Sequence, residues 1–175
     1  MINPFKDFYY KIKNDLIFFI EIKQSNITLF NVLFALISVR MIPVYIYRIS
    51  YFFNLIYLKP VSKLFSFLNF IIFGIEIAIN TNIGAGFFLP HTHGIVIGAI
   101  SIGERSVIYH NVTIGAKFID TSNELLGRPK IGNNVKIATG SIIIGSIEIG
   151  DNVVIGPNLV ITKSIESNCK ITANI

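Results

Sequence analysis

The stretch IGNNVKIATGSIIIGSIEIGDNVVIGPNLVITKSIE, residues 131–166, repeats a pattern every six residues. Isoleucine opens all six units, at positions 131, 137, 143, 149, 155 and 161, and the fifth position of each unit is apolar or small. A period of six fits neither the 3.6-residue turn of an α-helix nor the two-residue alternation of a strand. It fits a solenoid in which three units close one triangular coil, with isoleucine inside and Gly, Asn and Asp at the corners. The sequence therefore predicts a mainly β fold, a left-handed parallel β-helix.

The same period occurs upstream, in two series of inward-facing residues whose phases differ by one: Ile77, Ile83, Leu89 and Ile95, then Val96, Ile102, Ile108 and Ile114. Residues 117–130, KFIDTSNELLGRPK, break the repeat and are expected to leave the β-helix as an excursion loop. A loop of that length in a compact fold is usually functional. We therefore assign residues 76–175 to one β-helix domain that carries this loop.

The first 75 residues have a different composition. They carry eight Lys and Arg against three acids, whereas the remaining residues carry seven of each, so the whole net charge of +5 lies before residue 76. The same segment holds 18 of the 22 Phe and Tyr residues. Long apolar runs are interrupted by charges at intervals and by Pro43, Pro60 and Gly74, a pattern typical of several helices. Residues 1–75 are therefore predicted to form a basic, aromatic helical subdomain.

A basic, aromatic segment can address nucleic acid or an anionic membrane surface. Its aromatic residues lie within aliphatic runs rather than among clustered Arg and Lys, which disfavours nucleic acid. The longest uncharged runs within this N-terminal segment, residues 25–39 and 64–75, are shorter than the roughly 18–20 residues that span a bilayer, so peripheral contact is expected. The alternative is that the helices only pack on one another. The opening residues lack the pattern of a signal peptide, which predicts a cytoplasmic location, at the inner face of the membrane if contact occurs.

Two of the three histidines lie in LPHTHGIVIG, residues 89–98. His91 occupies the third position of its unit, and so does His110. The one-residue phase slip makes their separation equal to one coil, so the two side chains are expected one above the other at the strand spacing of about 4.8 Å. His93 falls on the inward-facing fifth position, where a buried imidazole that bonds backbone or orients its neighbour is the expectation.

The histidines could bind metal or act as acid and base. Zinc sites need three or four ligands; the inward position of His93 conflicts with a His-x-His pair, and apart from His110 no other His or Cys ligand is near, so no metal is expected. Near neutral pH a single imidazole can take a proton from an attacking hydroxyl. Glu76, 15 residues before His91, would lie on the previous coil, where a carboxylate could orient that imidazole. The alternative for Glu76 is a solvated charge at the junction with the helices.

The succession LPHTHGIVIG, IGERSVIYHNVTIGAK and RPKIGNNVKIATGSIIIG resembles the serine acetyltransferase branch of the hexapeptide-repeat acyltransferases, especially members that O-acetylate capsule or exopolysaccharide. The resemblance covers roughly residues 40–166. It implies a homotrimer that binds acetyl-CoA between subunits, with His91 as general base and Glu76 at the position of the aspartate that pairs with it. It places acetyl-CoA against Gly115, Ala116, Thr139 and Pro157, with Lys163 near a phosphate, and the acceptor near His93, His110 and Arg128.

Two departures from the serine-specific pattern bear on the acceptor. Pro90 stands where those enzymes have an aspartate, and Arg128 stands where they have a second histidine. We therefore expect an O-acetyltransferase that acts on a hydroxyl of a sugar or glycan precursor, in capsule, exopolysaccharide or lipopolysaccharide modification. The alternatives are a serine O-acetyltransferase of cysteine biosynthesis, a zinc hydratase, and a non-catalytic β-helix scaffold.

Overall fold

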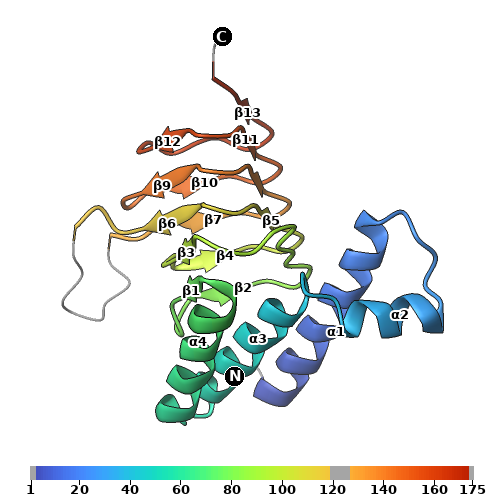
Figure 1. Ribbon diagram of the computed structural model, residues 1–175. Coiled ribbons are helices and arrows are strands. Elements are labelled where there is room, and N and C mark those ends of the chain that lie inside the picture. Colours follow the sequence, from blue (N-terminus) through green and yellow to red (C-terminus); the bar gives the residue numbers. More distant parts are fainter. Residues whose placement is uncertain (1–2, 119–126, 174–175) are drawn as a thin grey trace.

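The computed structural model describes residues 3–118 and 127–173 (Figure 1). Four helices come first: α1 (Pro4–Ile22), α2 (Leu29–Leu36), α3 (Ile42–Leu55) and α4 (Lys59–Phe73). The Asn3 side chain caps α1 by accepting a hydrogen bond from the Phe5 amide (3.0 Å). Gly74, in the left-handed region at φ 61°, ends α4 and leads directly into the first strand. The prediction of an N-terminal helical region is confirmed.

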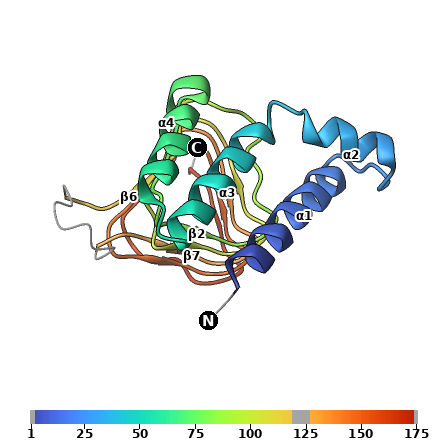
Figure 2. The ribbon, with the colours of Figure 1, turned by 90° about the horizontal axis from the view of Figure 1, so that it is seen from below.

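The rest of the described chain is built from short strands that form three parallel sheets, with orders β1-β3-β6-β9-β12, β10-β7-β4-β2 and β13-β11-β8-β5. Each of the three middle coils gives one strand to each sheet, while the first and last coils are joined at one side only by the single bridges Phe88–Val107 and Ile149–Ile165. The chain thus winds upward as the predicted left-handed β-helix (Figures 1 and 2). The strands are β1 (Ile75–Ile77), β2 (Asn82–Ile83), β3 (Ile95–Ile97), β4 (Ser101–Ile102), β5 (Val107–Ile108), β6 (Thr113–Gly115), β7 (Lys130–Ile131), β8 (Lys136–Ile137), β9 (Ile142–Ile144), β10 (Glu148–Ile149), β11 (Val154–Ile155), β12 (Val160–Ile161) and β13 (Lys170–Ile171).

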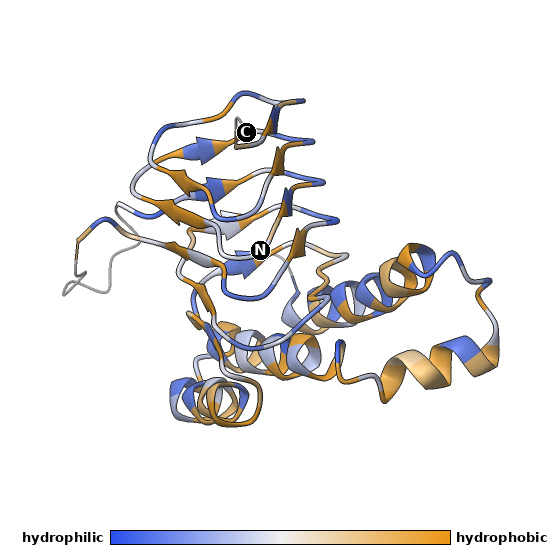
Figure 3. Cartoon of the chain, turned by 45° about the horizontal axis from the view of Figure 1, so that its top comes forward, coloured by the Kyte–Doolittle hydropathy of each residue, from blue (hydrophilic) through white to orange (hydrophobic). Residues whose placement is uncertain are grey.

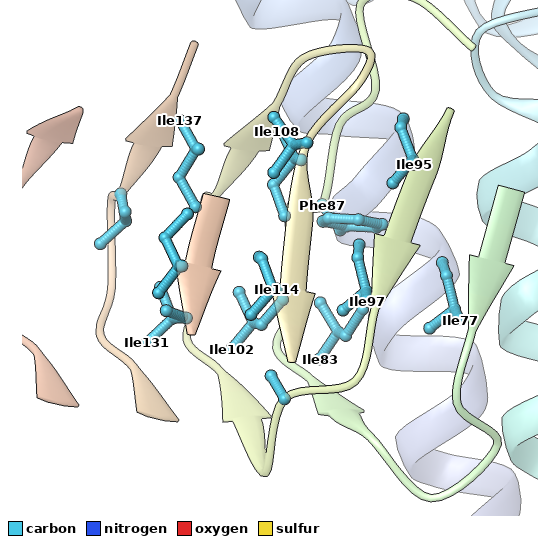
Figure 4. Packing of buried hydrophobic residues seen from close by; sticks show 14 of the residues in the cluster. Ile77, Ile83, Phe87, Ile95, Ile97, Ile102, Ile108, Ile114, Ile131 and Ile137 are labelled. Atoms are coloured by element: carbon cyan, nitrogen blue, oxygen red, sulfur yellow. The ribbon is translucent and has the colours of Figure 1, made fainter. Parts of the chain in front are cut away.

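The isoleucine series forms the core. Figure 4 shows isoleucines of successive coils pointing into the same interior. All six isoleucines of the opening repeat are buried, which confirms the six-residue period. The fifth positions are buried at Val135, Ser141, Ile147 and Val153 and half-buried at the last two units. The Ser141 hydroxyl is satisfied there because it donates to the Gly156 carbonyl (2.7 Å).

The shift in phase lies at one corner of the first coil, and the second series of inward-facing residues was predicted to begin one residue too early, at Val96. Val96 points outward and is 39% exposed, whereas Ile95 and Ile97 are both buried. Phe88 bridges Val107, 19 residues on, but Val96 pairs with Thr113, only 17 residues on. The coil therefore shortens between these two contacts, at a corner where two successive residues have positive φ.

Helices α3 and α4 close the lower end of the β-helix, and their buried residues Val44, Tyr47 and Phe73 continue its apolar core (Figures 1 and 2). Tyr47 donates a hydrogen bond to the Thr81 carbonyl (2.7 Å) and accepts one from the Ile83 amide (3.2 Å). In the described part of the chain, no helix is long and apolar enough to cross a membrane.

A buried ion pair fastens α1 and α3 to the first coil. The Arg48 guanidinium donates to both Asp15 carboxylate oxygens, from Nε at 2.8 Å and Nη2 at 3.0 Å, and also to the Ile83 and Gly84 carbonyls (both 2.6 Å). Burial alone would lower the pKa of Arg48, but the neighbouring Asp15 carboxylate outweighs it and the pKa is raised. Arg48 thus makes no contribution to the exposed basic surface that the composition suggested.

Candidate active site

Apart from Glu76, which lies within β1, the predicted site residues lie at the two ends of the strands of the five-stranded sheet β1-β3-β6-β9-β12. All its strands are parallel, so the residues that precede the strands lie along one side of the sheet, here called its amino-terminal edge. The residues that end or follow the strands lie along the opposite side, its carboxyl-terminal edge. The amino-terminal edge carries His91, His93, His110, Thr139 and Pro157, and the carboxyl-terminal edge carries Gly115, Ala116, Arg128 and Lys163. A three-residue strand is about 10 Å long. One chain therefore does not bring all the predicted residues together.

His91 and His110 are neighbours, as the register predicts. Their ring centroids are 5.4 Å apart, with the planes at 85° to each other. The Tyr109 ring lies 6.3 Å from that of His91. His91 is exposed and is therefore accessible to a substrate at this corner.

Thr139 fixes the tautomer of His110. The Thr139 hydroxyl donates to the His110 carbonyl (3.0 Å), and its Oγ1 also lies 3.0 Å from His110 Nε2. Since the hydroxyl proton is already used, Nε2 is the donor of the second bond and Nδ1 is the bare acceptor. His110 Nδ1 is buried and has no hydrogen-bond partner within the residues that the structure describes.

The prediction that His93 is buried is wrong. Its side chain is exposed, and its φ of 76° places it in a left-handed turn where the alternation of the repeat does not hold. The His93 amide donates to the Phe73 carbonyl (3.0 Å), and the imidazole packs over Gly74, where an added Cβ would come within 3.3 Å of Cδ2. Nδ1 is 2.9 Å from the Thr92 hydroxyl oxygen. His93 therefore shapes the corner from outside.

The structure does not place Glu76 opposite His91, in contrast to the prediction from the sequence. It is exposed on β1, and its partner in register is Val96, 20 residues on, rather than a residue 15 positions away. Glu76 and His91 flank the corner that His93 forms over Gly74. Across the described ranges, no hydrogen bond or ion pair joins them, so the predicted dyad is not assembled in this conformation.

The carboxyl-terminal edge presents open backbone. Within the residues that the structure describes, a Cβ built on Gly115 meets no atom within 4 Å, and the same holds for Gly145, whose amide donates to the Gly115 carbonyl (3.0 Å). Arg128 lies against Gly98, where an added Cβ would be 3.5 Å from its Nη1. Lys163 is exposed just after β12.

The predicted excursion 117–130 lies mostly outside the described residues, which omit 119–126. Its predicted end is one residue too late, because Lys130 already belongs to β7 and pairs with Ser101 of the coil below. In the described ranges 3–118 and 127–173, no three His, Cys, Asp or Glu side chains gather as a metal site requires.

Comparison with known proteins agrees with this geometry. Residues 128–163 match the family described as Bacterial transferase hexapeptide (six repeats). The chain carries the bacterial transferase hexapeptide repeat. It is 44% identical over 72 residues to a serine acetyltransferase of Staphylococcus epidermidis, covering 40% of this chain and 32% of that protein. It is 31% identical over 102 residues to one of Synechococcus elongatus, covering 49% and 42% respectively.

Solved structures extend the similarity to nearly the whole chain. Serine acetyltransferase of Neisseria gonorrhoeae shares the fold, with a TM-score of 0.83, 23% identity, and coverage of 97% of this chain and 63% of that one. Entamoeba histolytica serine acetyltransferase 1, in complex with L-cysteine, gives a TM-score of 0.81 at 25% identity, covering 95% and 63%. The chain is thus similar to serine acetyltransferases in fold and in part of its sequence, and it spans less than half the length of the curated relatives.

These comparisons overturn the expectation of a glycan acceptor. The relatives and structural neighbours are serine acetyltransferases, not capsule or exopolysaccharide enzymes. The expectation of a glycan acceptor rested on the resemblance to capsule and exopolysaccharide enzymes and on Pro90 and Arg128, two positions of a similarity in fold that extends over the whole β-helix. Neither polysaccharide synthesis nor membrane contact gains support from them.

Proposed function

We propose that this chain is a serine O-acetyltransferase, which transfers the acetyl group of acetyl-CoA to the hydroxyl of L-serine. One observation carries the proposal: His91 is exposed beside His110, at the edge of a β-helix that matches serine acetyltransferases over almost its whole length. The open backbone at Gly115 and Gly145 suits the pantetheine arm of acetyl-CoA, which must pack closely against main chain. The exposed Lys163 is available to a CoA phosphate.

In the proposed reaction, His91 acts as the general base. Its neutral imidazole takes the proton of the serine hydroxyl while that oxygen attacks the thioester carbonyl carbon. Backbone N–H groups at the open edge stabilise the tetrahedral oxyanion. When the intermediate collapses, the C–S bond breaks and the imidazolium returns its proton to the departing CoA thiolate. The products are O-acetylserine and CoA, and His91 is again neutral.

The acceptor side is assigned to the corner around His91. His93 and His110 flank the base there, and Arg128 reaches it from another subunit if the chain assembles as below. Glu76 orients His91 only after one of the two side chains rotates, since no bond joins them in this conformation. A Glu76→Gln variant tests that role. Loss of turnover with an altered pH profile supports it, and an unchanged profile excludes it.

We further propose a homotrimer with acetyl-CoA bound between subunits. The predicted residues occupy opposite edges of one sheet. A three-fold ring that sets the carboxyl-terminal edge of one chain beside the amino-terminal edge of the next joins both sets in one groove. Co-expression of His91→Asn chains with Ala116→Trp chains tests this. Each variant alone is expected to be inactive, and mixed trimers regain turnover because some grooves receive two intact edges. No recovery would exclude a shared site.

The deciding experiment measures CoA thiol release from acetyl-CoA with L-serine. The His91→Asn variant should lose about 10²- to 10⁴-fold in turnover, because the general base is removed, while acetyl-CoA binding by calorimetry stays unchanged. Glu148→Gln, which opens an exposed ion pair with Lys130, serves as the control. Retained turnover in His91→Asn would exclude the mechanism. Tight acetyl-CoA binding without serine-dependent thiol release would exclude serine as the acceptor.

A further inference from the structure

The segment of residues 25–39 is uncharged and largely exposed. It contains α2, whose only buried residue is Ala35, packed beside Phe19 of α1. Figures 1 and 2 show α2 at the edge of the molecule, away from the β-helix, and in Figure 3 most of α2 has the orange colour of hydrophobic residues. Eight large apolar side chains of the segment are each 43–75% exposed: Ile27, Leu29, Phe30, Leu33, Phe34, Leu36, Ile37 and Val39. Such a contiguous patch marks an interaction surface.

Cations bracket this apolar segment. Lys23 precedes it and Arg40 follows it. Both line a pocket of about 540 Å³ that also includes Arg105 and Lys136. Among the described residues, Glu21 is the one carboxylate that lines the pocket, and it is paired with Arg105 (2.9 Å).

The other three cations of the pocket have no acidic partner in the described part of the chain. Lys23 instead lies over the Phe34 ring, 4.1 Å from its centroid. The pocket therefore keeps a net positive charge next to the apolar face.

We infer that residues 25–39 and the basic pocket dock this protein on an anionic lipid bilayer. An eight-residue helix is about 12 Å long, too short to cross a hydrocarbon core of about 30 Å, so α2 would lie in the interface. Its apolar side chains enter the acyl boundary, and Lys23, Arg40 and Lys136 meet lipid phosphates. The membrane surface is the occupant that satisfies both the apolar face and the unpaired cations.

A second copy of the chain fits this surface less well. If two copies paired through the same face, Lys23 and Arg40 of one would approach Lys23 and Arg40 of the other, and like charges would repel. An anionic bilayer instead attracts them. The inference does not depend on the proposed acetyl transfer, because binding to lipid is measured without turnover.

The test is co-sedimentation of the full chain with phosphatidylcholine vesicles, with and without phosphatidylglycerol. Binding is expected only to the anionic vesicles and should weaken as salt increases. The Lys23→Glu/Arg40→Glu variant should lose about tenfold or more in partition coefficient. The matched control is Lys59→Glu/Lys63→Glu, which makes the same charge change on α4 and should bind as wild type.

A second variant tests the apolar face. Leu29→Ser/Phe30→Ser/Ile37→Ser should reduce vesicle binding by about a hundredfold or more, because three apolar side chains no longer leave water. Tyr57→Ser, which removes an 87% exposed aromatic side chain elsewhere, is its control. Circular dichroism and unfolding midpoints verify that each variant is folded, which is expected because all these side chains lie on the surface.

Three results would overturn the inference. The first is that wild type does not bind anionic vesicles. The second is that the charge variant and its α4 control weaken equally, which would show a net-charge effect without a docking surface. The third is that the triple serine variant keeps vesicle binding but changes oligomeric size by light scattering, which would assign the face to a second copy.

Discussion

Removing Asp15 should destabilise the protein and disturb the candidate site together. Asp15 is fully buried, and its Oδ1 accepts hydrogen bonds from the Gly86 and Phe87 amides (both 2.8 Å), in the segment that leads to His91. An Asp15→Ala variant loses those two bonds and both bonds to Arg48, and it leaves a buried guanidinium without a counter-charge. Breaking a buried ion pair in this way costs about 3–5 kcal/mol.

The assay is urea-induced unfolding followed by circular dichroism at equal protein concentrations, since assembly makes stability concentration-dependent. Asp15→Ala should lower the free energy of unfolding by about 3–5 kcal/mol. Asp15→Leu/Arg48→Met should recover part of that loss, because no charge is then buried alone. Glu148→Gln, at an exposed pair, should remain close to wild type. If Asp15→Ala were no less stable than Glu148→Gln, the ion pair would not hold the helices to the β-helix.

Three further predictions concern the coils and the site. Gly103→Ala should cost about 1–3 kcal/mol in unfolding experiments, because the new Cβ would lie 2.5 Å from the Gly132 carbonyl carbon of the next coil; wild-type stability would contradict this. Thr139→Val removes the acceptor of His110 Nε2–H, so nitrogen NMR should show one tautomer in wild type and a mixture in the variant. Burial raises the pKa of Tyr47, so it stays neutral when folded but ionises when unfolded above pH about 10. The free energy of unfolding should then fall above that pH by up to about 1.4 kcal/mol per unit, and the slope should be shallower in Tyr47→Phe.

The sequence predicted the β-helix because each coil repeats the same environment. An interior of stacked isoleucine selects one residue type at one position of every unit, and that regularity is visible without coordinates. Counting units also placed His91 beside His110, since side chains one coil apart must meet in a parallel register. Both features follow from the six-residue period, so a count of residues was sufficient to predict them.

At the corners of the coils, counting residues in units of six predicted the wrong side-chain directions. Backbone torsions there change which way a side chain points, so His93 faces solvent and the second inward series begins at Ile97. The same error affected the predicted position of Glu76, whose partner in register is Val96. The chain does carry a signal for these turns, because Asn111 occupies a positive φ of 56° on the coil above His93 and its amide donates to the His93 carbonyl. Asn favours that conformation, but the repeat alone does not say which corners use it.

By itself, the sequence determined the solenoid, its isoleucine core and the histidine pair, because all three follow from a local period. Only the tertiary structure decided which charges are available at the surface. In the sequence, Arg48 is one basic residue among several. In the structure it is buried against Asp15, 33 residues earlier, while Lys23 and Arg40 remain exposed around α2. The physical reason is that the pairing of distant helices depends on how α1 and α3 pack under the first coil, and no local pattern in either helix encodes that contact.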